Sequence, residues 1–237
     1  ASLYIRDTYE YRIDIYGKKK EGTPLYSTVV TGGAGKNPID IPLDFVKGNE
    51  LLKVYITVTN EAGEHTNYWR IFVYSDTGSD VRIPEDIVIH NRADYERALS
   101  KGGKFLLLPE FYGEENTVKS SFIPVFWSPV HFPTEDPLGF IVDEDSDVLK
   151  GFPTEKYADY QWKSPVENSR SVRLKDVPGD SKVLFEFVPN FADNEPKSPL
   201  FILKEGHSEF LYCGFDLEGN DPASKALSQS ISDYLFH

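Results

Sequence analysis

The spacing of apolar residues changes near residue 76, and this change constrains the fold more than any other feature of the sequence. Between residues 9 and 15, tyrosines and isoleucines alternate with charged residues, which is the pattern of a half-buried strand. Turn residues follow, and no ten-residue helical period interrupts the first 75 residues. Further strands are predicted at residues 25–31, 39–43, 52–58 and 68–74. Residues 1–76 are therefore predicted to form an all-β, immunoglobulin-like sandwich.

A polar stretch at residues 75–80, of the kind that joins domains, precedes a different pattern. Residues 87–89 and 105–108 are short apolar runs typical of buried strands in a parallel sheet. Residues 93–100 between them have helical spacing, with Asn91 placed to cap the start and Gly102 to follow the end. This segment is predicted to be a strand–helix–strand unit.

The rest of the second half continues the alternation of strands and helices. Residues 222–236 repeat apolar side chains at helical spacing, with Asp221 as the cap and Pro222 in the first turn. Strands are also predicted at residues 183–188, 200–203 and 210–215. Residues 81–237 are therefore predicted to form one α/β domain with an open sheet.

Charge and cysteine content exclude several classes of function. The net charge is −13, with 38 acidic against 25 basic residues, so the chain repels phosphate on average. Neither nucleic acid nor an anionic membrane is expected as a partner. One cysteine permits no internal disulfide, which argues against a disulfide-stapled secreted module. The sequence contains no signal-peptide pattern or transmembrane run, so we expect a soluble chain, either cytoplasmic or with upstream sequence removed.

No motif in the chain predicts catalysis, a metal site or a cofactor. Residues 32–36 superficially resemble a phosphate loop, but Asn37 replaces the required Ser or Thr. Cys213 lies in an apolar strand, where a buried, inert thiol is expected. His207 and Glu209 have the His-x-Glu spacing of glutamine amidotransferases, but in that class the cysteine comes far earlier in the chain. The five histidines are scattered without metal-ligand spacing.

The region from residue 109 to 168 is long, irregular and rich in proline, glycine and aromatic residues. Such a loop is usually functional or an interface. Flat aromatic rings beside carboxylates suit the C–H faces and hydroxyls of a sugar, although the same residues could pack as a domain interface. We expect Trp127 and Trp162 to stack on such a surface, and His131 and Asp159 to form hydrogen bonds there.

Several motifs of this half, taken in order, resemble the C-terminal region of glycoside hydrolase family 2 proteins of the β-galactosidase type. The resemblance spans about residues 66–236, and TNYWRIFVYSD (66–76) resembles the end of the preceding β-sandwich. The motifs are FIPVFWSPVHF (122–132), GFPTE (151–155), ADYQW (158–162), NSR (168–170) and CGFDLEG (213–219).

The resemblance implies that residues 81–237 have a class I glutamine amidotransferase-like (flavodoxin-like) fold without its nucleophile. It places catalysis in an upstream (β/α)8 barrel of the same parent chain, where two glutamates act. That barrel needs about 250 residues, and the two domains leave no room for it. Lys163 stands where the family tends to have a second tryptophan, which reduces any aromatic platform at Trp162.

These expectations lead to one main hypothesis and two alternatives. The chain is expected to be the non-catalytic accessory part of a glycoside hydrolase, which supports the barrel and contacts carbohydrate. The first alternative is a stand-alone carbohydrate-binding module. The second is a cryptic amidotransferase-like hydrolase that uses Cys213 or His207.

Overall fold

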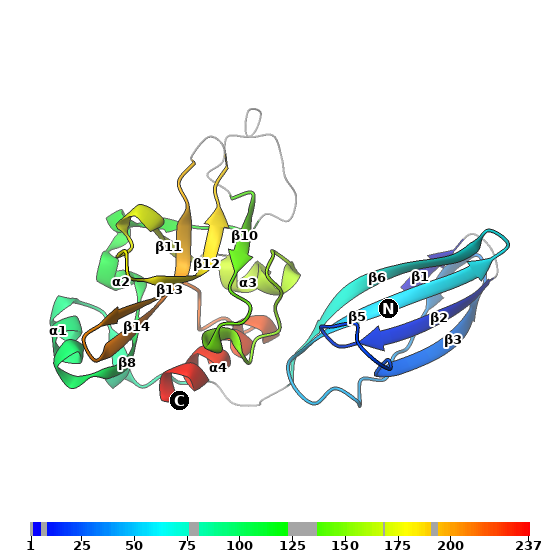
Figure 1. The fold of residues 1–237 in the computed structure, drawn as a ribbon, viewed down its shortest axis with the longest axis horizontal. Coiled ribbons are helices and arrows are strands. Elements are labelled where there is room, and N and C mark those ends of the chain that lie inside the picture. Colours follow the sequence, from blue (N-terminus) through cyan, green and yellow to red (C-terminus); the bar gives the residue numbers. More distant parts are fainter. Residues whose placement is uncertain (1, 6–8, 76–80, 123–136, 168, 191–193) are drawn as a thin grey trace. The chain divides into compact units, whose positions relative to one another are not determined.

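The protein divides into two compact units, Ala1–Asp76 and Thr77–His237, and the division falls in the polar stretch at residues 75–80 (Figure 1). This computed structural model describes residues 2–5, 9–75, 81–122, 137–167, 169–190 and 194–237. Within these ranges, no helix is both long enough and apolar enough to cross a membrane. Each unit has its own core and is described separately below.

The first unit consists of β-strands, as the alternating pattern predicts. Four strands form an antiparallel sheet in the order β3-β2-β5-β6, and β1 pairs with β4 in a separate two-stranded sheet. The strands are β1 (Ser2–Ile5), β2 (Tyr9–Tyr16), β3 (Tyr26–Gly32), β4 (Gly35–Pro38), β5 (Glu50–Asn60) and β6 (Gly63–Val73). Ile13, Ile15, Leu52 and Val54 form the centre of the core.

One predicted strand of this unit is wrong. Residues 39–43 form no strand, and β4 ends at Pro38, immediately before them. Pro42 lies within the predicted run and has no N–H group to donate to a ladder, which explains why the apolar alternation there does not become a strand. Ile39 is nevertheless buried in the core, whereas Leu43 is 43 % exposed, so the alternation indicated burial only at the start of the run.

The second unit is built on a mixed sheet of eight strands. Six follow the order β10-β12-β13-β14-β8-β7, while β11 pairs with β13 and with β9. The β14–β8 and β8–β7 pairs are parallel, and the other pairs are antiparallel. The strands are β7 (Val88–Ile89), β8 (Gly103–Leu107), β9 (Thr117–Lys119), β10 (Gly139–Val142), β11 (Arg170–Arg173), β12 (Lys182–Val188), β13 (Lys197–Glu205) and β14 (Ser208–Cys213).

Two helices of this unit confirm the capping predictions. Helix α1 (Arg92–Lys101) joins β7 to β8, and the Asn91 side chain accepts a hydrogen bond from the Asp94 N–H at 3.1 Å. Gly102 ends the helix with a φ of 72°, a conformation that favours glycine. Asp221 accepts from the Ala223 and Ser224 N–H groups at the start of α4 (Pro222–Phe236).

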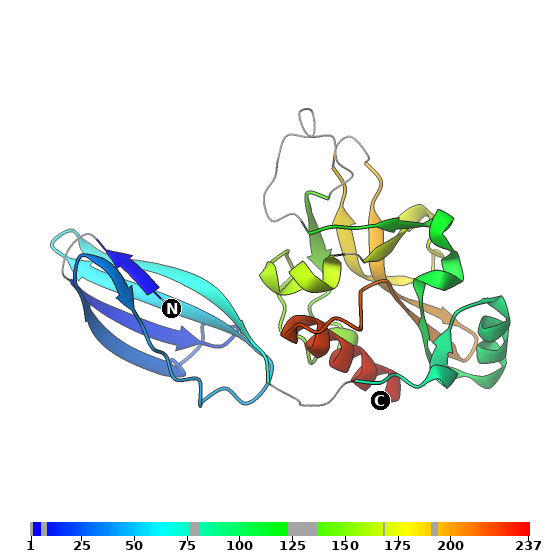
Figure 2. The same cartoon turned by 180° about the vertical axis from the view of Figure 1, so that it is seen from behind.

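Short helices fill the connections. They are α2 (Pro109–Tyr112), α3 (Lys163–Val166), and the 3-10 turns η1 (Glu85–Ile87), η2 (Glu114–Asn116), η3 (Asp147–Leu149), η4 (Tyr160–Trp162) and η5 (Leu174–Asp176). The view from behind shows α4, drawn in red, beside α3 (Figure 2). The Lys104 Nζ donates to the Tyr234 carbonyl at 2.8 Å, which ties β8 to the end of α4.

Candidate functional site

Of the four residues that the sequence marks as a candidate surface, the structure describes two. Trp127 and His131 lie in residues 123–136, which are outside the described residues. Asp159 and Trp162 are described, and both belong to the single turn η4, Asp159 as its cap and Trp162 as its last residue.

The surface position expected for Trp162 is wrong. Its side chain has 0 % exposure, and its ring lies 4.7 Å from Phe152, 4.9 Å from Phe185 and 5.5 Å from Phe215, measured between centroids. The indole Nε1 donates to the Thr154 hydroxyl at 2.9 Å. Trp162 is therefore a core residue of the second unit and offers no face to a sugar or to another domain.

The turn η4 explains why Tyr160 and Trp162, two residues apart in the chain, differ in their exposure to solvent. The Asp159 Oδ1 accepts from the Tyr160 N–H at 2.8 Å, and the Trp162 N–H donates to the Asp159 carbonyl at 3.1 Å. This tight turn directs Trp162 into the core and leaves Tyr160 67 % exposed. Spacing along the sequence could not show which of the two aromatic rings would face solvent.

Asp159 lines a small pocket at the start of β10. The pocket has a volume of about 150 Å³, and aromatic and apolar side chains form most of its wall. Its other lining residues are Ser121, Phe122, Pro137, Leu138, Gly139, Phe140, Ala158 and Tyr160. A pocket of this size suits one chemical group of a larger ligand or partner rather than a whole ligand.

Exposed apolar side chains accompany this pocket. Leu138 and Tyr160 line it and are 43 % and 67 % exposed. Next to them, Ile141 of the edge strand β10 pairs through an isolated bridge with Tyr157, which is 63 % exposed. We call these four residues together with Asp159 the Asp159 surface. Among the described residues of the second unit, Phe236 is the one other large apolar side chain with comparable exposure.

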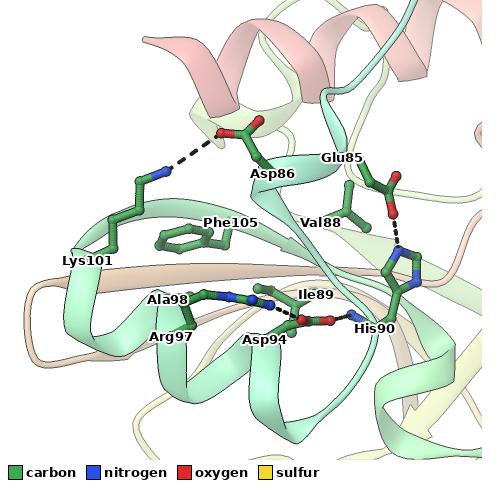
Figure 3. A pocket seen from close by; sticks show the side chains of 10 residues that line it. All are labelled: Glu85, Asp86, Val88, Ile89, His90, Asp94, Arg97, Ala98, Lys101 and Phe105. Atoms are coloured by element: carbon green, nitrogen blue, oxygen red, sulfur yellow. Dashed lines mark hydrogen bonds and ion pairs between the residues drawn. The ribbon is translucent and has the colours of Figure 1, made fainter.

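A larger cavity, of about 580 Å³, lies between η1, β7, α1 and β8 (Figure 3). Apolar side chains of both strands and of α1 form its floor, namely Val88, Ile89, Ala98 and Phe105. The remaining wall carries charge or can acquire it, and it consists of Glu85, Asp86, His90, Asp94, Arg97 and Lys101. The sequence predicts none of these cavity residues, and its one signal is the helical spacing that puts Asp94, Arg97 and Lys101 on one face of α1.

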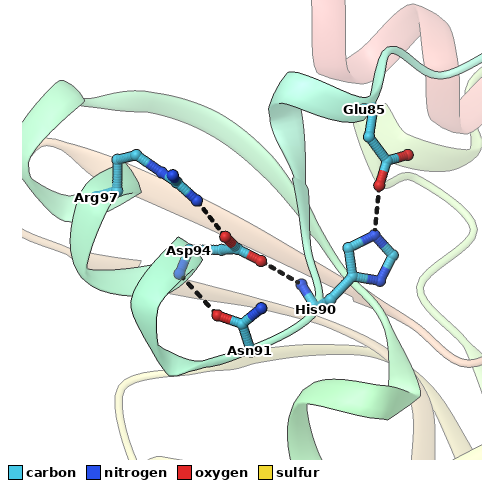
Figure 4. A network of polar contacts seen from close by, with 5 residues as sticks. All are labelled: Glu85, His90, Asn91, Asp94 and Arg97. Carbon is cyan, nitrogen blue, oxygen red and sulfur yellow. Dashed lines mark hydrogen bonds and ion pairs between the residues drawn. The ribbon is translucent and has the colours of Figure 1, made fainter.

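The ionisable side chains around this cavity contact one another in pairs. His90 Nε2 lies 2.7 Å from Glu85, and Lys101 Nζ lies 3.6 Å from Asp86, which joins α1 to η1. Arg97 contacts Asp94, whose other carboxylate oxygen accepts from the His90 backbone N–H at 3.3 Å (Figure 4). Because each cation already faces a carboxylate, the cavity suits a neutral polar ligand better than a phosphate.

The residues considered for a hydrolase do not form a catalytic pair. Cys213 has 0 % exposure, and burial raises the pKa of its thiol to about 12. His207 is exposed in the turn before β14, whereas Cys213 is the last residue of that strand. At about 3.3 Å per residue the two are roughly 20 Å apart. Cys213 and His207 are therefore too far apart to act together.

The remaining kinds of reactive centre are a nucleophile at a strand-to-helix turn and a metal site. Strand β8 is followed directly by Leu108 and Pro109 at the start of α2, so no nucleophilic side chain occupies this strand-to-helix turn. Across the described ranges, no group of three or more His, Cys, Asp or Glu side chains is placed to hold a metal ion.

The fold and its pockets define a β-rich protein of two units, whose second unit combines a mixed sheet with a charged cavity and a smaller aromatic pocket. The chain belongs to the family described as "Domain of unknown function (DUF8487)", whose model matches residues 87–237. This match covers the eight-stranded sheet and both pockets except Glu85 and Asp86. No curated protein matches the chain.

Proposed function

We propose that this chain is the non-catalytic accessory part of a glycoside hydrolase of the β-galactosidase type. In this proposal the first unit is immunoglobulin-like and the second is amidotransferase-like. The Asp159 surface contacts either the catalytic (β/α)8 barrel of the parent chain or the carbohydrate bound there. The observation that carries the proposal is that two exposed side chains, Leu138 and Tyr160, line the pocket together with Asp159, and that the exposed Tyr157 precedes Asp159 by two residues.

The chemistry of the Asp159 surface supports this role. Exposed patches of apolar side chains mark interaction sites more often than chance, and tyrosine combines a stacking ring with a polar hydroxyl. Tyr157 and Tyr160 lie on either side of Asp159 in the chain, and both are more than half exposed. Rings of this kind, each with a flat face and a polar hydroxyl, match the alternating apolar faces and hydroxyls of a sugar.

The second unit also has features in common with an amidotransferase-like domain that has lost its nucleophile. Strands β7, β8 and β14 form a parallel set, and α1 connects the first two. The turn after β8 holds Leu108 and Pro109 where a nucleophile would be needed, and Cys213 is buried. Both features favour a scaffold over a catalyst.

The first test is the size and activity of the native gene product. We expect a product captured from the source cells with an antibody against this chain to be several times larger than 26.9 kDa and to cleave aryl-galactosides. A native product of 26.9 kDa that hydrolyses no glycoside would contradict the proposal.

A second test addresses the Asp159 surface in that product. Replacing both tyrosines in the double variant Tyr157→Ala, Tyr160→Ala is expected to raise KM for the galactoside severalfold or to weaken the association of the barrel with this part. Phe236→Ala removes another exposed aromatic ring of the same unit and serves as the matched control. If the double tyrosine variant and Phe236→Ala had equal effects, the Asp159 surface would not be the surface that contacts the barrel or the carbohydrate.

One observation favours the alternative of a stand-alone carbohydrate-binding module. The cavity beside α1 is large enough for a small ligand, and the polar side chains of its wall offer hydrogen-bond donors and acceptors. Titration of the intact chain with galactose and lactose tests this alternative. Loss of affinity in Arg97→Ala but not in Tyr160→Ala would place the sugar in this cavity, and no affinity for either sugar would exclude the module.

A further inference from the structure

Strand β6 ends its sheet and is exposed along most of its length. It is the last strand in the order β3-β2-β5-β6, and among the described strands it pairs with β5 alone. Every residue from Gly63 to Ile71 is exposed, on both faces of the strand. The outer edge of β6 is therefore accessible over nine consecutive residues.

Apolar side chains occupy both faces of this exposed strand. The register places Trp69 opposite Val54 and Ile71 opposite Leu52, so these four side chains lie on the same face of the sheet. Val54 and Leu52 are 6 % and 1 % exposed, whereas Trp69 and Ile71 are 48 % and 37 % exposed. The apolar layer of the core thus continues onto β6 without being covered there.

The strand also lacks three of the features that usually prevent an edge from pairing. Natural edge strands are blunted by prolines, bulges or shortness. β6 has 11 residues, contains no proline, and pairs with β5 in a continuous register from Asn60–Gly63 to Glu50–Val73. Such an edge is suited to accept a further strand through backbone hydrogen bonds.

Backbone geometry identifies the groups that would bond an added strand. Asn60 and Gly63 flank a two-residue turn and therefore form a hydrogen-bonded pair, after which alternate residues of β6 face β5. Thr66 and Tyr68 consequently direct their backbone groups outward. In agreement with this, the Tyr68 N–H donates to the neighbouring Asn67 side chain at 2.9 Å.

We propose that β6 pairs antiparallel with β6 of a second copy of this chain, about a two-fold axis at Asn67. This register sets Glu64 of one copy opposite Arg70 of the other, twice by symmetry. It also sets Trp69 opposite His65, and Thr66 opposite Tyr68. Thr66 and Tyr68 are the residues whose backbone groups point outward. Strand β6 carries one acidic and one basic side chain, Glu64 and Arg70, so the charges of the strand itself do not repel a second copy. The net charge of the whole chain, −13, acts against association in general.

The proposal does not rest on the carbohydrate-related function, because it concerns the other unit and is tested by mass. Sedimentation equilibrium of the intact chain is expected to show a mass approaching twice 26.9 kDa as concentration rises from micromolar to near millimolar. A mass of 26.9 kDa over the whole range would overturn the proposal.

Charge reversal tests the register. Glu64→Arg and Arg70→Glu each place like charges opposite one another at two symmetric positions, and each is expected to weaken the dimer about tenfold. Glu64 Oε1 also lies 3.9 Å from Arg12 Nη2 of its own chain. The double variant Glu64→Arg, Arg70→Glu restores opposite charges between the copies and is therefore expected to recover most, but not all, of the affinity of the original chain. Lys36→Glu changes an exposed lysine of β4 by the same charge and serves as the control.

Hydrogen exchange in the original chain tests the same register without any substitution, so it remains informative if a variant folds poorly. In the original chain, exchange of the Thr66 and Tyr68 amides is expected to slow with increasing concentration. A dimer that forms without slowing these amides, or whose affinity is unchanged in both single variants, would show that another surface mediates association.

Discussion

At the scale of the residue, the turn η4 determines the environment of the two aromatic side chains in this part of the site. Both Tyr160 and Trp162 lie in a motif whose sequence suggested a sugar-binding or interface surface. The hydrogen bonds of Asp159 fix the turn, and only Tyr160 remains accessible. The candidate surface therefore depends on Tyr160 and Tyr157, while Trp162 contributes to stability.

Truncating Trp162 is expected to destabilise the second unit strongly. Trp162→Ala removes a fully buried ring from a cluster of phenylalanines and leaves Thr154 without its indole donor, which should lower the free energy of unfolding by about 3–5 kcal/mol. Chemical denaturation monitored by circular dichroism measures this change. Tyr160→Ala is the matched control and should stay within about 0.5 kcal/mol of the original chain.

Cys213 is expected to be inert toward thiol reagents in the native protein. Burial raises its pKa to about 12, so only about one thiol in 10,000 would be ionised near pH 8 even if the reagent could reach it. Labelling with a chromogenic disulfide should be negligible until denaturant is added. Rapid stoichiometric labelling of the native chain would show that the strand around Cys213 opens readily.

At the scale of the element, local signals located the caps of α1 and α4, and proline explains one strand that was wrongly predicted. The caps at Asn91 and Asp221 lie where the sequence places them, since a capping side chain acts on N–H groups only two or three residues away. Residues 39–43 alternate like a strand but form none, because Pro42 cannot donate to a ladder.

The cap of α4 should make stability depend on acid pH. Burial of Asp221 acts to raise its pKa, but hydrogen bonds from Ser164, Ser224 and backbone N–H groups outweigh this and lower the pKa. A carboxyl whose pKa is lower in the folded state adds stability above its unfolded pKa, about 3.9, and loses it as pH falls through the folded value.

Comparing Asp221→Asn with the original chain isolates this contribution. Asparagine preserves a side-chain acceptor but does not titrate, so the original chain should be the more stable near neutral pH and the difference should shrink as pH falls below about 4. Urea denaturation at a series of pH values measures it. A difference that stays constant with pH would mean that the charge of Asp221 does not contribute.

At the scale of the whole molecule, the two units have separate hydrophobic cores, and the family model matches only the second. Residues 77–237 are therefore expected to fold without the first unit. Thermal unfolding of this fragment, followed by near-ultraviolet circular dichroism, should show one cooperative transition. Absence of such a transition would mean that the second unit requires contacts from residues 1–76.

The sequence by itself determined the two-part organisation, the β-rich first unit, the strand–helix–strand segment and the capped final helix. These features follow from periodicity and capping, which act over a few neighbouring residues. Only the tertiary structure decided that Trp162 is buried, that β14 lies parallel to β8, and that Asp86 meets Lys101 across a cavity. Each of these depends on packing between residues far apart in the chain, and no local pattern records which distant side chains will cover a given face.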